Sequence, residues 1–481
     1  MIESEDQRVL KPTYRVIAEP RLRYLIPLVI ACGFFMENLD STILATSIPQ
    51  MAASLGENPL RLNVAITSYL LSLAVFIPIS GWVADRFGAR SVFCTAIGVF
   101  TFGSALCGLA TSLPMLVLTR ILQGLGGAMM TPVGRLIMLR SFPKSELVTA
   151  MSYVTLPALV GPAIGPLVGG FLTTYMNWRW IFYINIPIGL LGIALAYRFA
   201  ENFRSSAVSR FDFVGFALCG IGLAAAELAL ENAGRRAIPG AAEAAIVAVS
   251  ALSLAAYVYY ARRAPDPAVD LTLFRVKTFR IAVIGGGICR TGLGAIPFLL
   301  PLMLQVPFGL SAFQSGSLTF VLAIGSMVMK STSPPLLRAF GFRTLLLGNA
   351  ALVGLLTMAL ALVRAETPHW LLIVGLLVFG FFRSLQFTCM NTLAYSDLTD
   401  TTISKGSSIA SVGQQLSQSF GVAIGATILA VLTGNTGTPS IGEFTPAFIA
   451  VGLLPLISIA FFVRLSAEDG SQVSGHHPAK T

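Results

Sequence analysis

The sequence predicts an all-α polytopic membrane protein, and three observations support this fold class. Of the 481 residues, 55% are hydrophobic and only 11% are charged, which is too little charge to cover a water-soluble chain of this length. Apolar stretches of about 20 residues, the length that a helix needs to cross a bilayer, recur along most of the chain. The Lys and Arg residues gather in alternate loops, as in other helical membrane proteins.

Apolar runs bounded by charges or by Pro and Gly predict fourteen membrane-spanning helices. They are expected near residues 24–48, 61–83, 91–111, 113–139, 147–174, 178–198, 211–231, 241–261, 279–305, 311–333, 343–364, 370–395, 405–433 and 444–464. If the amino terminus is inside the cell, most basic residues fall in cytoplasmic segments, so both termini are predicted to be cytoplasmic. The same bias accounts for the net charge of +10 without a nucleic-acid partner.

A short internal repeat divides the chain. The stretch Phe87–Arg90 (FGAR) is matched 253 residues later by Phe340–Arg343 (FGFR), and each follows an expected span. Parallel repeats occur in transporters built from two six-helix bundles. The offset is long enough for eight spans, so two additional helices are expected between the bundles. The predicted segments are a cytoplasmic tail (1–20), a first six-helix bundle (21–200), two inserted transmembrane helices (201–265), a second six-helix bundle (266–465) and a cytoplasmic C-terminal tail (466–481).

Five motifs in the first half are distinctive. They are LDSTILATSIP (39–49), GWVADRFGAR (81–90), RILQGLGGA (120–128), GPAIGPLVGG (161–170) and WRWIFYINIPIG (178–189). Together they resemble the major facilitator superfamily, specifically its fourteen-helix drug:proton antiporters of the EmrB/QacA type and, among these, the MdtD-like multidrug exporters. The first motif departs from that branch at Ala45, where Asn is usual, and at Ser47 and Ile48, where Ala and Leu are usual. The resemblance implies the major facilitator fold and proton-driven export.

Cofactor, metal and nucleotide sites are not expected. The six cysteines are scattered singly, and the three histidines lie in a loop and in the tail. The Gly-rich stretches follow no predicted strand, and no G-x-x-x-x-G-K-[ST] motif occurs. We therefore expect an ion gradient as the energy source. The expected partners are a proton, a small-molecule substrate and the lipid bilayer of the inner membrane, with no nucleic acid and no nucleotide, and the protein is expected to be a monomer.

The loop motif after the second span contains the candidate gating residues, Gly81, Asp85, Arg86, Gly88 and Arg90. Asp85 can accept hydrogen bonds at a helix N-terminus or pair with an arginine, while the two arginines can hold neighbouring helices together. Such a charged latch would favour the conformation that is closed to the cytoplasm. Plain anchoring of positive charge inside the cell is the alternative for the arginines. Arg338 occupies the position of Asp85 in the second half, which is therefore expected to lack this latch.

The predicted fifth helix contains the candidate antiporter motif, Gly161, Pro162, Gly165, Pro166, Gly169 and Gly170. Glycines spaced every four residues share one helix face and allow a second helix to approach closely. The prolines remove backbone donors and bend the helix. We expect a hinge or a seal here, with ordinary close packing as the alternative.

Ionisable residues inside predicted spans are the candidate functional residues. Glu37, Asp40, Arg120, Arg290 and Arg383 lie on spans 1, 4, 9 and 12, which would line the central cavity of the fold that the resemblance implies. Three other charged residues, Lys330, Glu227 and Arg135, lie near span ends, where solvation or snorkelling is expected.

Each candidate residue has an expected role. Asp40 is expected to carry the proton and to pair with Arg120 at a similar depth, with a static structural pair as the alternative. Glu37, three residues before Asp40, is expected to share its face, to favour proton uptake by repulsion and to contact substrate. Arg290 and Arg383 are expected to bind substrate, and they favour organic anions because arginine is a natural partner of carboxylate and phosphate.

The predicted function is proton-coupled efflux of small amphipathic or organic-anion molecules by alternating access. Proton-coupled uptake of an organic anion is the alternative within the same fold. An intramembrane enzyme is the alternative of a different class, but it would need a cluster of Asp or His residues that the sequence lacks. A secondary active transporter, rather than an enzyme, is therefore expected.

Overall fold

The computed structural model describes residues 25–142, 144–204, 211–235, 239–399, 402–434 and 438–476. All regular secondary structure in these residues is helical. Thirteen helical stretches in the described part of the chain are long and apolar enough to cross a membrane. The all-α membrane fold is thus confirmed, whereas the count of fourteen spans stays a prediction.

The helices fall into three consecutive sets along the chain. The first set comprises α2 (Leu25–Ile43), η1 (Leu44–Ser47), α3 (Ile48–Leu55), η2 (Pro59–Leu62), α4 (Asn63–Phe76), η3 (Ile77–Ile79), α5 (Ser80–Phe87), α6 (Ala89–Gly108), α7 (Leu113–Ser141), α8 (Lys144–Tyr175), α9 (Trp180–Tyr183) and α10 (Asn185–Phe199). The second set is the pair α11 (Phe213–Arg235) and α12 (Gly240–Ala261). The third comprises η4 (Leu271–Arg275), α13 (Lys277–Arg280), η5 (Ile281–Gly285), α14 (Gly286–Gly294), α15 (Ile296–Gln305), α16 (Ala312–Ala359), η6 (Leu360–Leu362), α17 (His369–Tyr395), α18 (Ile403–Thr433), α19 (Ile441–Phe462) and α20 (Ser471–Ser474).

Helix formation follows from composition and from local signals at helix starts. An apolar chain in lipid can satisfy its backbone N–H and C=O groups within a single segment only by forming a helix. Ser112 caps α7 by accepting a hydrogen bond from the Met115 N–H, and Ser311 forms a capping box with Gln314 at the start of α16. Several spans are built from more than one helical element, such as the first span, in which the 3₁₀ turn η1 joins α2 to α3.

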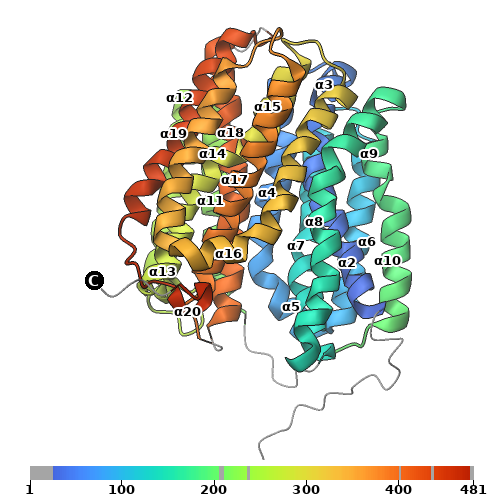
Figure 1. The fold of residues 1–481 in the computed structure, drawn as a ribbon. Coiled ribbons are helices and arrows are strands. Elements are labelled where there is room, and N and C mark those ends of the chain that lie inside the picture. The colour runs from blue at the N-terminus through green and yellow to red at the C-terminus, as the bar shows by residue number, and fades with distance from the viewer. Residues whose placement is uncertain are drawn as a thin grey trace, which may run out of the picture.

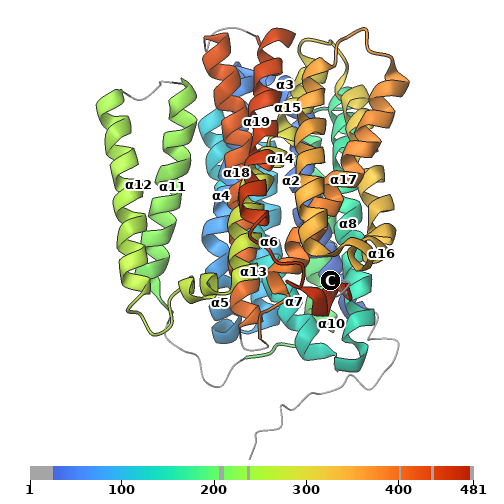
Figure 2. The ribbon, with the colours of Figure 1, turned by 60° about the vertical axis from the view of Figure 1, so that its left-hand side comes forward.

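The first and third sets lie on opposite sides of the molecule, and the pair α11–α12 stands beside them (Figures 1 and 2). Within this arrangement, α11 packs against α4 of the first set and α18 of the third, as well as against α12. Below, we call the first set the first half and the third set the second half. The predicted segment boundaries themselves stay a prediction.

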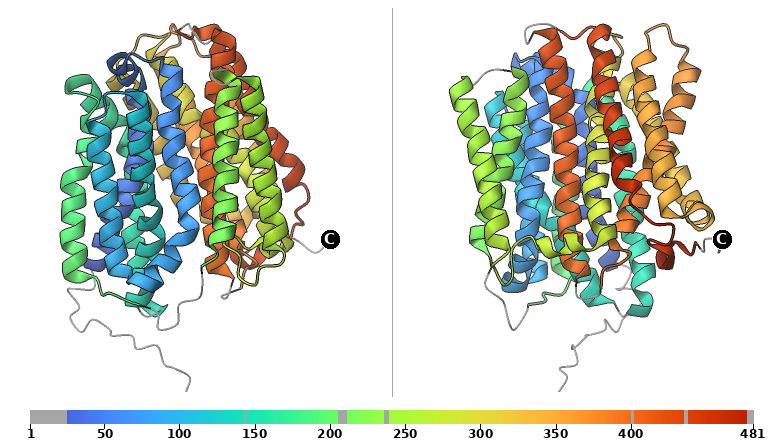
Figure 3. Two further views of the ribbon diagram at one scale, coloured as in Figure 1. Left: turned by 180° about the vertical axis from the view of Figure 1, so that it is seen from behind. Right: turned by 90° about the vertical axis from the view of Figure 1, so that its left-hand side faces the viewer.

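The short helix α20, near the described C-terminal end of the chain, lies at the same end of the molecule as α13 and α5 (Figures 1 and 3). We call this the α13 end and the opposite one the α15 end. Arg61, Arg179 and Arg364 are the described basic residues of loops and helix starts near the α15 end. Most other described basic residues outside the spans lie near the α13 end, so charge is distributed unequally between the two ends.

The two copies of the sequence repeat share an unusual backbone conformation. Gly88 and Gly341 both have positive φ, at +97° and +68°, and each follows an exposed phenylalanine. Residues with a Cβ rarely adopt this conformation, which explains why both repeats use glycine. The helices predicted at 311–333 and 343–364 both lie within α16, which consists of two helices joined at Gly341, where the backbone is not helical. This element contributes two separate stretches that could cross a membrane, Ala312–Lys330 and Thr332–Leu362.

Candidate functional site

Asp40 and Arg120 form a buried ion pair inside the first half. The Arg120 guanidinium donates to Asp40 Oδ2 at 2.5 Å, and each residue is only 1% exposed. Helix α2 supplies the acid and α7 supplies the base, which is the pairing expected from their depths along the two spans. Because an isolated charge is very costly in such a place, each group compensates the charge of the other.

Uncharged groups from three further positions complete this site. Gln123, one turn after Arg120 on α7, accepts from Arg120 at 2.8 Å and donates to Asp40 Oδ1 at 2.8 Å. Asn185, the first residue of α10, donates to the same Asp40 oxygen at 3.3 Å. The Arg120 Nε–H donates to the carbonyl of Ala65 on α4 at 2.9 Å. The ion pair is therefore held by four helices of one half.

Gln123 and Asn185 are functional candidates that sequence reasoning missed. Both lie inside motifs that had been recognised, RILQGLGGA and WRWIFYINIPIG. The available signal was a polar amide in an otherwise apolar segment, and for Gln123 a spacing of three residues from Arg120, which places the two on one helix face.

The ring of Tyr69 also contacts Arg120. Its centre is 4.2 Å from the Arg120 guanidinium carbon, which is a cation–π contact.

Glu37 is on the same helix as Asp40 but has different partners. Thr131 of α7 donates to Glu37 Oε2 at 2.5 Å, and Glu37 is mostly buried. One turn further on, Arg135 donates to Ser407 of α18 at 2.8 Å and so contacts the second half. The expectation that Arg135 simply snorkels to solvent is therefore wrong, because its guanidinium joins the two halves.

Arg290 and Arg383 lie together in the second half. Their guanidinium carbons are 5.7 and 5.4 Å from the ring centre of Phe387, so one aromatic side chain contacts both. Arg290 on α14 is 4% exposed and donates to Asn391 of α17 at 2.6 Å. Among the described residues, neither arginine has a carboxylate within 4.0 Å, and the Nε atom of each is buried without a hydrogen-bond partner. This region thus holds two positive charges that no described protein group neutralises.

The predicted latch residues bond within the first half. Asp85 accepts from Arg140 of α7 at 3.0 Å, and both side chains are about one-third exposed. Arg86 lies over the ring of Trp82, and Arg90 donates to the carbonyl of Ala200 just after α10. Gly81 has open space around it, whereas Gly88 makes the turn between α5 and α6. None of the hydrogen bonds described for these side chains reaches the second half.

The glycines of α8 allow two other helices, α2 and α16, to pack closely against α8. A Cβ atom added to Gly161, Gly165 or Gly169 would lie within 3.0 Å of the backbone or side chains of α2. Gly170 faces the opposite direction, and its added Cβ would lie 2.3 Å from the carbonyl oxygen of Ala312 on α16. Pro162 and Pro166 lie inside the same helix, and Gly316 of α16 packs against the Pro166 carbonyl. Helix α8 is therefore packed between α2 of its own half and α16 of the second half.

Further contacts between the halves lie at the α15 end. Gln305 of α15 donates to the carbonyl of Thr46 at 3.0 Å and accepts from Gln50 at 3.3 Å. The Phe313 N–H donates to Thr174 at 3.0 Å, beside a cluster of aromatic rings formed with Phe171 and Tyr175. These contacts join the two halves at this end of the molecule.

Sequence and structure comparisons identify the family. The model of the Major Facilitator Superfamily matches residues 30–422 and 282–480. The MdtD multidrug resistance protein of Pectobacterium atrosepticum is 39% identical over 439 residues, covering 91% of this chain and 93% of the relative. That of Salmonella paratyphi A is 40% identical over 442 residues, covering 91% and 92%.

Solved structures share the fold at low sequence identity. A D-xylose–proton symporter superimposes with a TM-score of 0.67 at 15% identity, covering 93% of this chain and 99% of that one. An auto-inhibited peptide transporter of the POT family gives a TM-score of 0.66 at 17% identity, covering 96% and 99%. The chain is therefore a multi-pass membrane transporter, and it belongs to the major facilitator superfamily as a relative of the MdtD multidrug resistance proteins.

Proposed function

We propose that this transporter is a proton-coupled efflux antiporter of the inner membrane, which exports small amphipathic or organic-anion molecules by alternating access. The buried Asp40–Arg120 pair is the observation that carries this proposal. It is a titratable pair inside an apolar bundle, held by neutral amides, and such groups commonly serve proton transfer. The multidrug resistance proteins to which the chain is similar support export as the direction.

The proposed topology has fourteen spans, with α8 as the fourteenth, and both termini in the cytoplasm. Helix α8 is 32 residues long and lies between α2 and α16, inside the set of spanning helices. The basic residues concentrate at the α13 end, which the positive-inside rule assigns to the cytoplasm. The contacts of Gln305 and Phe313 would then close the extracytoplasmic end, and the Arg135–Ser407 bond would join the halves nearer the cytoplasm.

The proposed cycle uses the ion pair as its switch. When Asp40 takes a proton from the outside, its attraction for Arg120 falls and the carboxyl becomes neutral. The halves then rock, the proton leaves toward the cytoplasm, and the restored carboxylate pairs with Arg120 again while substrate binds. Gly170 and Gly316 supply the close contact over which α8 and α16 would move, and the Asp85–Arg140 pair would stabilise the first half at the cytoplasmic end.

The proposed substrate site is the Arg290–Phe387–Arg383 cluster, with Glu37 contributing from the first half. Two guanidinium groups without a carboxylate partner favour a ligand with a carboxylate, sulfonate or phosphate group. The Phe387 ring, which contacts both guanidinium groups, offers an apolar surface for the remainder of an amphipathic molecule.

Substrate-dependent proton movement in reconstituted vesicles tests this proposal. Purified protein is placed in liposomes containing a pH-sensitive dye, and cationic and anionic amphipathic compounds are added in turn. We expect proton movement opposite to that of the substrate, and only with anionic or zwitterionic compounds. Proton movement in the same direction as the substrate would replace efflux by uptake, and no proton movement with any transported compound would overturn proton coupling.

A further inference from the structure

Helix α11 of the pair beside the two halves buries polar side chains that the cycle above does not use. Glu227, Glu231 and Asn232 are 3%, 7% and 4% exposed. Glu227 lies eight residues before the end of α11, about 12 Å along the helix axis. The expectation that Glu227 is solvated near a span end is therefore wrong, since its side chain is turned inward between helices.

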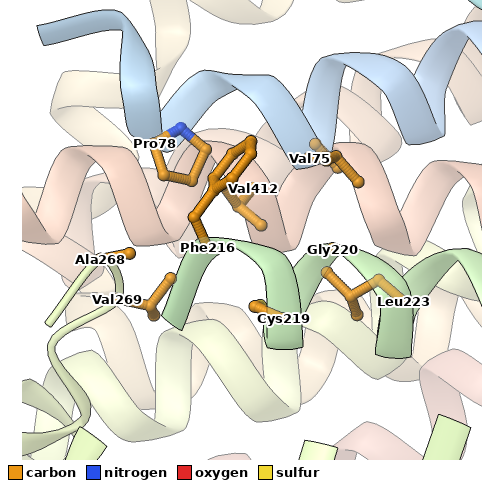
Figure 4. A pocket seen from close by; sticks show the side chains of 10 residues that line it. Val75, Pro78, Phe216, Cys219, Gly220, Leu223, Ala268, Val269 and Val412 are labelled. Atoms are coloured by element: carbon orange, nitrogen blue, oxygen red, sulfur yellow. The ribbon is translucent and has the colours of Figure 1, made fainter. Parts of the chain in front are cut away.

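The buried face of α11 is bonded to both halves at once. Ser419 of α18 donates to Glu227 Oε1 at 2.9 Å and lies 3.3 Å from the carbonyl oxygen of Thr67 on α4. The Thr67 hydroxyl donates in turn to Glu231, so one residue of the first half and one of the second meet at two carboxyl groups of α11. We call Glu227, Thr67 and Ser419 the α11 joint. Closer to the α13 end, the same three helices pack through apolar side chains such as Val75, Phe216 and Val412 (Figure 4).

The environment of Glu227 suits a neutral carboxylic acid. Its Oε2 atom is buried without a hydrogen-bond partner, and among the described residues no Lys or Arg lies within ion-pair distance of it. An ionised carboxylate left uncompensated in such a place is very costly, and protonation removes that cost. Among the described side chains, the titratable ones on α11 and on the helices packed against it are Cys219 and Glu231 on α11 itself, Tyr69 on α4, Lys405 on α18, and Glu243, Tyr257, Tyr259 and Tyr260 on α12. Lys405, at the start of α18, pairs with Asp266 instead.

A short stretch of α4 connects the α11 joint to the Asp40–Arg120 pair. The Ala65 carbonyl accepts from Arg120, and the carbonyl oxygen of Thr67, two residues later, lies 3.3 Å from the Ser419 hydroxyl oxygen. A movement of α4 that accompanies loss of the ion pair would therefore also strain the bonds of the joint. Since α4 and α18 belong to different halves, rocking of the halves would separate Thr67 from Ser419 and expose Glu227.

We propose that Glu227 is a second protonation site of the transport cycle, located at the α11 joint. The proton is held on the carboxyl group while α4 and α18 are packed together, as in this structure. When the halves separate, water reaches the carboxyl group, its O–H bond breaks and the proton passes to water. The hydrated carboxylate takes up a proton from water again, which re-forms the O–H bond, before the joint closes. This assignment gives the α11–α12 pair a role in energy coupling. The coupling role rests on the proposed function, whereas the protonation of Glu227 does not.

Infrared spectroscopy and proton counting on the full-length protein test this assignment. At neutral pH, the Glu227→Gln variant should lack one carboxylic-acid C=O stretching band of the wild type, and the matched Glu366→Gln variant, altered at an exposed loop carboxylate, should keep it. In reconstituted vesicles, Glu227→Gln should move one proton fewer per substrate molecule. Ser419→Ala, which keeps the carboxyl group, should shift the band while leaving the proton count unchanged.

The two measurements separate this inference from the proposed function. A wild type that moves no protons but shows the Glu227 band would overturn the proposed function and the coupling role together, and would leave Glu227 as a static buried acid. A proton-coupled wild type whose proton count is the same in Glu227→Gln, or which shows no band assignable to Glu227, would overturn the second site alone. If Glu227→Gln fails to fold, the wild-type band and its shift in Ser419→Ala still decide whether Glu227 is protonated.

Discussion

The two halves of the molecule surround a buried arginine in similar ways but neutralise it differently. Arg120 and Arg290 are 1% and 4% exposed, each bonds a side-chain amide, Gln123 at 2.8 Å and Asn391 at 2.6 Å, and each lies near an aromatic ring. Among the described residues, a carboxylate pairs with Arg120, namely Asp40, but none pairs with Arg290. The comparison teaches that the buried arginine of the first half is neutralised by the protein itself, whereas that of the second half has its positive charge available for a ligand.

Removing each of these arginines gives the largest expected contrast. Arg120→Gln leaves Asp40 buried without its base, which should cost about 3–5 kcal/mol of unfolding free energy. Arg290→Gln removes a charge that has no counter-ion and should leave stability unchanged or raise it. Thermal unfolding of the two purified variants in the same detergent checks this difference.

A double variant separates charge from shape in that experiment. Asp40→Asn combined with Arg120→Gln removes both charges and should recover most of the stability lost by Arg120→Gln alone. Equal destabilisation by Arg120→Gln and Arg290→Gln would show that the two halves do not differ in the way described above.

Binding of anionic compounds should depend most strongly on the two arginines of the second half. Arg290→Gln or Arg383→Gln should weaken binding of an amphipathic carboxylate by roughly 30-fold or more, since loss of one partner of a buried charge pair costs about 2–5 kcal/mol. Arg364→Gln, in an exposed loop of the same half, is the control. Calorimetric titration of the wild type and the three variants measures this effect, and equal affinities would remove the cluster from the substrate site.

A methyl group at the contact between the halves should have a smaller effect. The Cβ of Gly170→Ala would lie 2.3 Å from the Ala312 carbonyl oxygen, so the backbone of α8 or α16 must shift, at about 1–3 kcal/mol. Gly348→Ala places its Cβ in open space within α16 and should be neutral or slightly stabilising. Melting temperatures of the two variants provide the test, and a neutral Gly170→Ala would contradict the tight packing of the halves here.

The Asp85–Arg140 pair should contribute least to stability. Its side chains are 37% and 33% exposed, and exposed ion pairs contribute about 0–1 kcal/mol. A double-mutant cycle with Asp85→Asn and Arg140→Gln should therefore give a coupling energy below about 1 kcal/mol. A larger value would mean that the pair acts on the equilibrium between conformations, as the latch prediction holds.

The sequence was most informative for charged residues inside apolar spans, because few environments can stabilise a buried charge. Asp40 and Arg120 lie at similar depths in apolar spans, and buried charges of opposite sign require each other, so the pair could be predicted without a structure. The family motifs and the apolar runs likewise predicted the superfamily and its helical fold.

Other features depended on helix rotation and on partners distant in the sequence. Glu37 and Asp40 are three residues apart, yet Thr131 binds one and Gln123 the other. Glu227 lies near the predicted end of its span, so solvation was the simplest expectation. Helix α11 is apolar on most sides, and nothing in its own sequence says which face contacts Ser419. The partner of Asp85 was also unpredictable, since Arg140 is 55 residues further along the chain.

The role of Asp40 as the proton carrier is the central claim, and transport by the Asp40→Asn variant tests it most directly. The variant is reconstituted with an imposed pH gradient, and accumulation of an anionic substrate is compared with passive exchange of labelled for unlabelled substrate. We predict that Asp40→Asn loses accumulation driven by the pH gradient but retains exchange, because the substrate cluster lies in the other half. Accumulation at the wild-type level would contradict the assignment of Asp40 as the proton site.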